Sequence, residues 1–147
     1  MIKKTLFAIA VIFCFMNTQC EDDDIVEPQM GVCDEIIIAN KAIFDNLVSD
    51  NFTFSKAEIV GDCLNFEIGA SGCNGNTWEY KLVDSGAIAE SLPEQRYLKF
   101  QLVNNEECLA VFTRTVSFDL TPLRINNNVN EIILNIDDLK PSLHYKY

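Results

Sequence analysis

The strongest constraint on this chain is a two-residue alternation of apolar and polar side chains, which recurs from residue 52 to the C-terminus. The alternating apolar positions include Leu64, Phe66, Ile68, Trp78, Tyr80, Leu82, Leu98, Phe100, Leu102, Ile132, Leu134 and Ile136. Turn-forming pairs, such as Gly61-Asp62 and Asn104-Asn105, separate these runs. Because period two gives a strand one apolar face, we expect an all-β fold. The pattern predicts an antiparallel β-sandwich of immunoglobulin-like or jelly-roll-like type with about seven strands.

The large aromatic side chains at alternating positions are expected to form the core of this sandwich. They are Trp78, Phe66, Phe100 and Phe118. Packing is the usual role of such rings, and an aromatic ligand platform is the alternative.

Two stretches depart from simple alternation. Residues 108–120 form a β-prone run longer than an ordinary strand, which predicts a bulge or bend within it. Residues 35–50 combine a β-branched run at 36–38 with helix-like apolar spacing over 42–48. We expect a strand there, followed by one short helical segment near 40–49.

Four cysteines lie in the region that should fold. They are Cys33, Cys63, Cys73 and Cys108. In an exported chain, four cysteines indicate two disulfides, with three possible connectivities. A zinc site would require closely spaced cysteine pairs, which the sequence lacks.

Strand geometry favours one of these connectivities. An extended run from Cys63 to about residue 70 is roughly 23 Å long at ~3.3 Å per residue. Three more residues cannot bring Cys73 back to the ~5.5 Å Cα separation of a disulfide. Strands that run up and down place Cys73 near Cys108, at the end opposite Cys33 and Cys63. We therefore prefer Cys33–Cys63 with Cys73–Cys108.

The N-terminus has the features of an export signal. Lys3 and Lys4 precede an apolar run of about 11 residues at 6–16, which is too short to span a bilayer. A buried core helix is the less favoured alternative. No small-residue cleavage pattern follows the run, which ends at Asn17-Thr18-Gln19-Cys20. This segment resembles the lipobox of bacterial lipoproteins. The resemblance implies cleavage before Cys20 and diacylation of its thiol, with palmitate as a typical acyl group.

An acidic run at residues 21–24 follows Cys20. Such a run stays hydrated and acts as a tether. It is also similar to the signal that sends Bacteroidota lipoproteins to the outer face of the outer membrane. The sequence thus predicts a signal peptide at 1–19, a lipid-anchored tether at 20–32 and a β-sandwich domain at 33–147, held at the cell surface.

The net charge limits the partners. Without the signal peptide, nine basic residues face 22 acidic residues, which gives a formal charge of −13. Nucleic acids and anionic lipid surfaces are bound through basic patches, so the charge argues against both. Membrane attachment is therefore expected through lipid on Cys20, and the remaining partner classes are a glycan or a protein.

Several short motifs resemble known bacterial proteins. Cys33-Asp34-Glu35, Gly61-Asp62-Cys63-Leu64, Ser71-Gly72-Cys73 and the segment 117–123 resemble small uncharacterised cysteine-containing lipoproteins of Bacteroidota. That resemblance implies no activity. Phe118-Asp119-Leu120-Thr121, with the segment 130–133, is similar to part of the jelly-roll sugar-binding domains of glycoside hydrolases.

Catalytic groups are sparse in this sequence. Its one histidine, His144, alternates with apolar neighbours and should point to solvent from a final strand. Carboxylate pairs suited to glycoside hydrolysis arise by chance in so acidic a chain. Asp137-Asp138 and the run 22–24 are possible calcium ligands, but their spacing matches no calcium loop, and solvated turns are favoured. We predict no enzyme activity, no cofactor and no metal.

A polar, glycine-containing loop at residues 71–76 is the best candidate for binding, because fixed loops on a rigid scaffold commonly carry binding groups. The candidate side chains are Ser71, Asn74, Asn76 and Trp78. The sequence thus favours a non-catalytic binding or interaction module. The alternatives are a structural lipoprotein of a larger envelope complex, a carbohydrate-binding accessory protein and, least favoured, a hydrolase.

Overall fold

The computed structural model describes residues 32–126 and 128–147. The expected signal peptide, Cys20 and the tether as far as residue 31 lie outside these residues. In the described part of the chain, no helix has the length and apolar character needed to cross a bilayer.

Nine strands and two short helices make up the described chain. In chain order they are β1 (Glu35–Ile36), β2 (Ile38–Ala39), α2 (Lys41–Asn46), β3 (Thr53–Val60), β4 (Cys63–Gly72), β5 (Glu79–Ala89), β6 (Glu94–Val103), β7 (Ala110–Asp119), the 3₁₀ helix η2 (Thr121–Leu123), β8 (Glu131–Ile136) and β9 (Leu143–Lys146). The expected all-β fold is confirmed. The expected number of strands was lower because β1 and β2 have two residues each, too few for an alternation to be visible.

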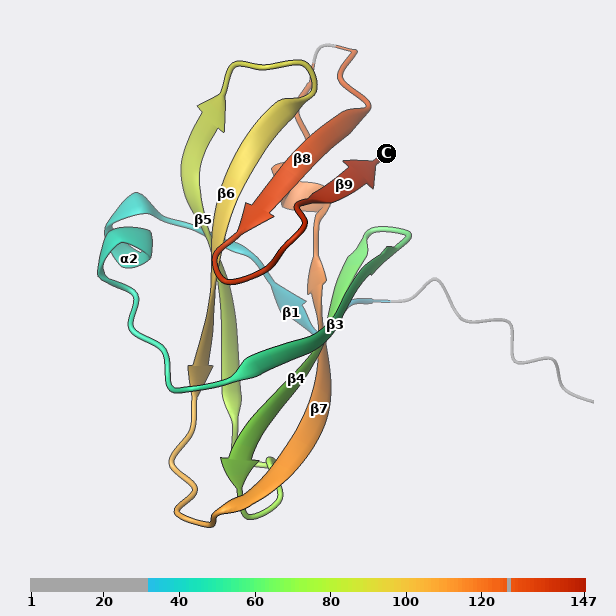
Figure 1. Cartoon of the computed structure of the whole chain (residues 1–147). Coiled ribbons are helices and arrows are strands. Elements are labelled where there is room, and N and C mark those ends of the chain that lie inside the picture. The colour runs from blue at the N-terminus through green and yellow to red at the C-terminus, as the bar shows by residue number, and fades with distance from the viewer. Residues whose placement is uncertain (1–31, 127) are drawn as a thin grey trace, which may run out of the picture.

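The strands form two sheets, one with the order β1-β7-β4-β3 and the other with the order β2-β5-β6-β8-β9 (Figure 1). The expectation of purely antiparallel sheets was wrong. Three neighbouring pairs run parallel, namely β1–β7, β2–β5 and β6–β8. Apolar alternation defines the two faces of a strand but carries no information about the direction of its neighbour.

One apolar core is built from both sheets. The inward positions of β4, β6, β7 and β8 contribute its largest part, as the alternation predicted. Phe66 and Phe118 of the four-stranded sheet meet Phe100 of the other sheet there, and the three ring centroids lie 5.5–6.0 Å apart. Trp78 is also buried, so all four predicted core aromatics are confirmed.

The bulge expected within residues 108–120 is absent. β7 pairs with β4 in continuous register from Ala110 to Asp119. The register breaks instead in β3, between Phe54 and Lys56, and in β5, between Asp84 and Ile88. Gly86 lies inside the second break with φ of 75°, a conformation that glycine adopts without steric cost. Strand length alone was therefore a poor guide to bulges.

The segment at 33–50 joins the two sheets and then covers one of them. β1 pairs with β7 in the four-stranded sheet, and β2 pairs with β5 in the other. The expected helical segment is α2, whose N-cap Asn40 accepts a hydrogen bond from the Ile43 amide at 3.0 Å. Lys99 fixes α2 against β6, donating to the Phe44 carbonyl at 3.2 Å.

Two disulfides fasten the domain. Cys33 bonds Cys63, and Cys73 bonds Cys108, with Cα separations of 5.6 and 4.8 Å. This is the connectivity preferred from strand length. Cys33–Cys63 joins the chain just before β1 to the start of β4, and Cys73–Cys108 joins the loops at the opposite end of β4 and β7.

Candidate functional site

The loop at residues 73–77 wraps around a carboxylate supplied by another segment. Glu106 accepts hydrogen bonds from the backbone amides of Cys73, Asn74 and Gly75 at 2.5–3.0 Å, all through Oε2. Its other oxygen accepts from the Thr77 hydroxyl at 2.9 Å. Successive amides that converge in this way form an anion-binding concavity. In this protein the chain's own glutamate fills it.

These contacts stabilise the charged form of Glu106. Hydrogen bonds from the amides of Gly75 and Asn74, the Thr77 hydroxyl and the Cys73 amide lower the pKa of its carboxyl to about 2. The packing is close, because a Cβ added at Gly72 would collide with this carboxylate and with the Trp78 ring. A side chain at residue 72 would therefore have to displace the Glu106 carboxylate from the loop amides.

Internal contacts engage parts of the four binding candidates in this loop, although the Ser71 hydroxyl forms no hydrogen bond with a described residue. The Ser71 carbonyl accepts from the Asn104 side chain at 2.7 Å. Asn76 accepts from Arg114 at 3.1 Å, and Arg114 also bonds the Asn74 carbonyl. Trp78 is only 6% exposed, so it offers no ring surface to a ligand, and its indole Nε1 has no partner among the described residues.

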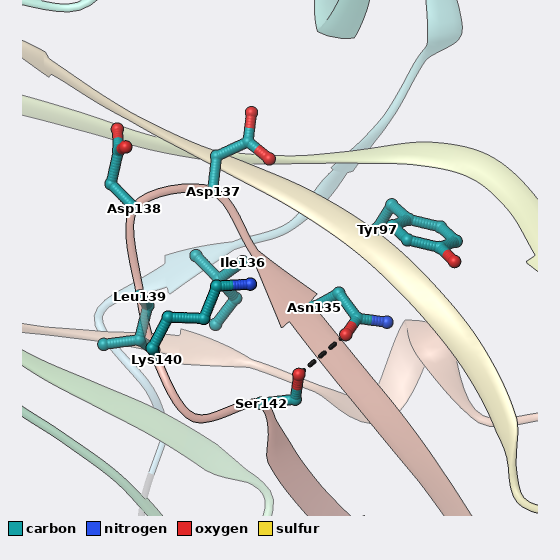
Figure 2. A pocket seen from close by; sticks show the side chains of 8 residues that line it. All are labelled: Tyr97, Asn135, Ile136, Asp137, Asp138, Leu139, Lys140 and Ser142. Carbon is teal, nitrogen blue, oxygen red and sulfur yellow. Dashed lines mark hydrogen bonds between the residues drawn. The ribbon is translucent and has the colours of Figure 1, made fainter.

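A second polar region, which sequence reasoning did not single out, lies at the end of β8. A pocket of about 230 Å³ is hollowed there, on the outer side of the five-stranded sheet (Figure 2). It is lined by Tyr97, Asn135, Ile136, Asp137, Asp138, Leu139, Lys140 and Ser142. We call this set the Tyr97 pocket. One signal for it was present: Tyr97 is an aromatic residue at an outward position of a strand whose inward positions are apolar.

Register explains how β6 and β8 bring the lining residues together. Tyr97 is paired with Asn135 in the parallel ladder, so their side chains lie side by side on the outer face. Asp137 lies directly after the end of β8, two residues beyond Asn135, and its amide donates to the Leu98 carbonyl at 3.0 Å. The chain then turns at Asp138, with φ of 64°, and the Leu139 amide closes the turn on the Ile136 carbonyl.

The floor of the Tyr97 pocket is rigid, whereas its rim is free to interact. Asn135 donates to Gln95 at 2.9 Å and accepts from Ser142 at 2.7 Å (Figure 2). The side chains of Tyr97, Asp138 and Lys140 make no hydrogen bond or ion pair with any described residue. Tyr97 is 42% exposed. The pocket thus combines an exposed ring with polar groups that have no internal partner.

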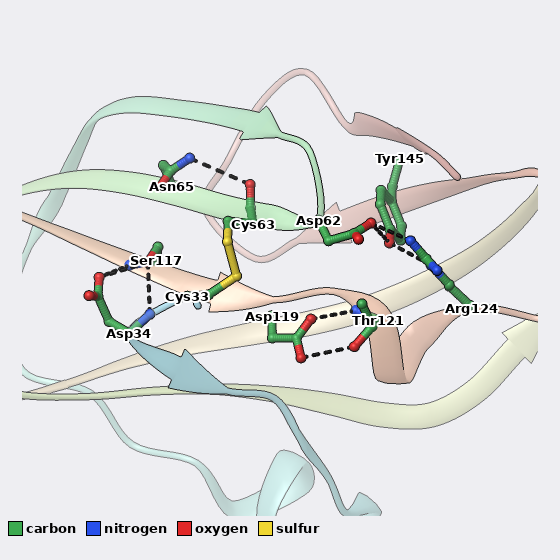
Figure 3. Close-up of a disulfide and its surroundings, with 10 residues drawn as sticks. All are labelled: Cys33, Asp34, Asp62, Cys63, Asn65, Ser117, Asp119, Thr121, Arg124 and Tyr145. Carbon is green, nitrogen blue, oxygen red and sulfur yellow. Dashed lines mark hydrogen bonds and ion pairs between the residues drawn. A yellow bond between two sulfur atoms is a disulfide. The ribbon is translucent and has the colours of Figure 1, made fainter. Parts of the chain in front are cut away.

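A polar network surrounds the Cys33–Cys63 disulfide (Figure 3). Asp62 accepts from the Tyr145 hydroxyl at 2.6 Å and also bonds Arg124, which donates to the same hydroxyl at 2.9 Å. Burial and the bond to Asp62 raise the pKa of Tyr145 to about 12, so the phenol stays protonated. The bond from Tyr145 and the Arg124 guanidinium lower the pKa of Asp62. These contacts tie β9 to the β3–β4 turn.

One ion pair is buried in the interior. Arg96 contacts Asp84 at 2.8 Å, with side-chain exposures of 12% and 0%. Burial raises the pKa of Asp84 despite the nearby guanidinium. Asp84 Oδ1 and Arg96 Nε have no partner among the described residues. The pair lies on the core-facing side of β5 and β6, where alternation alone predicts apolar residues.

His144 points to solvent from β9, as predicted, and its Nδ1 lies 2.7 Å from Glu131. Asp137 and Asp138 lie in the Tyr97 pocket. Across the described residues, no three histidine, cysteine or acidic side chains converge into a group able to hold a metal ion.

Comparisons with known proteins show a similar fold. No family model and no curated protein matches the chain. A solved structure of a "protein of unknown function DUF1344" from Bacteroides vulgatus is similar to it, with a TM-score of 0.51 and 17% identity over 77% of this chain. A "Putative TOXIN related protein" from Parabacteroides distasonis gives a TM-score of 0.49, also with 17% identity over 77% of this chain. The matches cover 55% and 59% of those two chains, so this chain corresponds to about half of each.

Proposed function

We propose that this chain is an exported protein, anchored to the bacterial outer membrane by lipid on Cys20, whose domain at 33–147 is a non-catalytic binding module at the cell surface. The observation that carries the proposal is the pair of disulfides, one near each end of β4. Disulfides persist in oxidising compartments, which a bacterial protein reaches only by export. The short apolar run and the lipobox-like Cys20 provide a route for that export.

We further propose that the scaffold is a β-sandwich of immunoglobulin-like or jelly-roll-like type. The shared core supports this, because side chains from both sheets pack into one apolar layer. A sandwich presents its loops and outer faces to partners without disturbing that layer. A binding role is supported by the Tyr97 pocket, where a hydrogen-bonded floor lies beside rim side chains that have no partner among the described residues.

The anchoring is tested by mass spectrometry of the protein isolated from its cells. We expect an N-terminal, diacylated Cys20 and a protein that fractionates with membranes. Cys20→Ala should abolish the lipid and release the protein. Cys14→Ala is the matched control, because this cysteine lies within the apolar run and should leave lipidation unchanged. An intact mass beginning at Met1, or cleavage elsewhere without lipid, would contradict the proposal.

A further inference from the structure

We propose that the Tyr97 pocket binds a neutral sugar ring of an oligosaccharide. This inference rests on the proposed binding function and names the ligand class of the pocket. It starts from the chemistry of the rim, where an exposed aromatic ring lies beside side chains that can both donate and accept hydrogen bonds. A pyranose has matching surfaces, because its C–H groups form an apolar face and its hydroxyls are both donors and acceptors.

Tyr97 supplies the apolar half of this recognition. Its ring lies beside the pocket from an outward position of β6 and is 42% exposed. The face of an aromatic ring is electron-rich and attracts the weakly positive hydrogens of C–H groups. Strand pairing with β8 fixes its backbone, so little conformational freedom is lost when a ligand stacks on it.

The polar lining selects for a neutral, hydroxyl-rich ligand. Asp137 and Asp138 accept hydrogen bonds, whereas Lys140 only donates them. Lys99 lies 3.9 Å from Asp137 and offsets part of its charge. A strongly anionic ligand would face two carboxylates on a chain with a formal charge of −11. Hydroxyls satisfy acceptors and donors together without introducing charge.

The dimensions favour one sugar ring in the pocket and further rings beyond it. The volume of about 230 Å³ lies below the roughly 300–1,000 Å³ typical of sites for drug-sized ligands. A second hollow of about 500 Å³ shares Asp138, Leu139 and Lys140 as its wall and continues to Phe52 and Phe54. An oligosaccharide can follow this path across the loop, whereas a monosaccharide contacts one hollow only. Affinity should therefore rise with chain length.

The experiment is a calorimetric titration of the protein as isolated from its cells, in a sugar-free detergent. The probes are cellohexaose, mannohexaose, xylohexaose and maltohexaose, each compared with its monosaccharide. We expect at least one hexamer to bind more tightly than its monomer. Tyr97→Ala should weaken that binding about ten-fold, whereas Tyr97→Phe keeps the ring and should stay within about three-fold of the parent. Lys140→Ala should also weaken the binding of that hexamer. Because Lys140 is exposed, this variant should fold normally.

Lys81→Ala is the matched control for Lys140→Ala, because Lys81 is an exposed lysine of the same sheet that lines neither hollow. It should leave binding unchanged. Failure of all four hexamers to bind would overturn the inference, as would binding that Tyr97→Ala leaves unchanged or Lys81→Ala removes. A second outcome would also overturn it. If calcium chloride gives a binding heat that Asp137→Ala removes, and no sugar gives a binding heat, the pocket binds a cation and not a sugar. The anchoring proposal is tested independently, since an unlipidated Cys20 leaves the titration unaffected.

Discussion

Two polar loops of this protein each follow an apolar strand, yet they use their polar groups in opposite ways. In the loop at 73–77, the Glu106 carboxylate accepts hydrogen bonds from three backbone amides and one hydroxyl. In the turn at 137–142, the backbone is closed locally, and the side chains of Asp138 and Lys140 have no partner within the described residues. The first loop is held together internally, and the second remains available to a ligand.

The difference comes from what lies opposite each loop. The 104–109 connection passes beside residues 73–77 and is joined to them by Cys73–Cys108, so a glutamate is within reach. Opposite 137–142 lies the outer face of β6, where Lys99 pairs with Asp137 at 3.9 Å and Tyr97 provides an uncharged ring, so no β6 group bonds Asp138 or Lys140. The polar groups of a loop thus remain available to a ligand only where no other segment of the chain forms hydrogen bonds with them.

The largest expected effect tests the structural role of the first loop. Replacing both Cys73 and Cys108 by Ser removes a disulfide that links two residues 35 positions apart in the sequence. The free energy of unfolding should fall by about 3–4 kcal/mol, because the unfolded chain gains conformational freedom. Urea denaturation measures it. Oligosaccharide titration of the folded variant should be unchanged, and its loss would show that the two loops are coupled.

A smaller effect is expected when the carboxylate in the first loop is neutralised. Because the folded pKa of Glu106 is about 2 against an ordinary 4.5, its contribution to stability is complete above pH 4.5 and disappears as the pH falls towards 2. Glu106→Gln should lower the Tm at neutral pH and flatten the decline of Tm over that interval. Thermal denaturation by circular dichroism from pH 2 to 7 measures both.

Glu107→Gln is the control, since it removes the same charge from a side chain that holds no loop amide. Equal pH profiles for the two variants would mean that net charge, and not the local hydrogen bonds, controls acid stability.

The smallest effect belongs to the rim of the second loop. Asp138→Asn and Lys140→Ala should each change the free energy of unfolding by no more than about 0.5 kcal/mol. Neither side chain forms a hydrogen bond or ion pair with a described residue, and Asn tolerates the positive φ of residue 138 as Asp does. Asn135→Ala, which removes two hydrogen bonds from the floor, should cost about 1–2 kcal/mol. Urea denaturation of all three ranks them. A large loss for Lys140→Ala would show that the rim is structural and weaken the comparison.

The sequence alone determined the longer strands, their apolar faces and the core aromatics. Period two assigns each side chain to a face, and burial of the apolar face follows from the hydrophobic effect. Strand length was also enough to favour Cys33–Cys63 with Cys73–Cys108, because extended chain between two cysteines keeps them apart. These properties are local, so neighbouring residues are sufficient to read them.

Only the tertiary structure decided which strands are neighbours and which polar groups are free. The parallel β6–β8 pair places Tyr97 beside Asn135, 38 positions later in the chain, and no periodicity encodes that register. The buried Arg96–Asp84 pair and the Glu106 carboxylate in the 73–77 loop likewise depend on contacts between distant segments. Composition marked residues 71–76 as polar, but only packing showed that the loop amides and Asn76 Oδ1 are engaged by Glu106 and Arg114. The side chains of Tyr97, Asp138 and Lys140 have no such partner among the described residues.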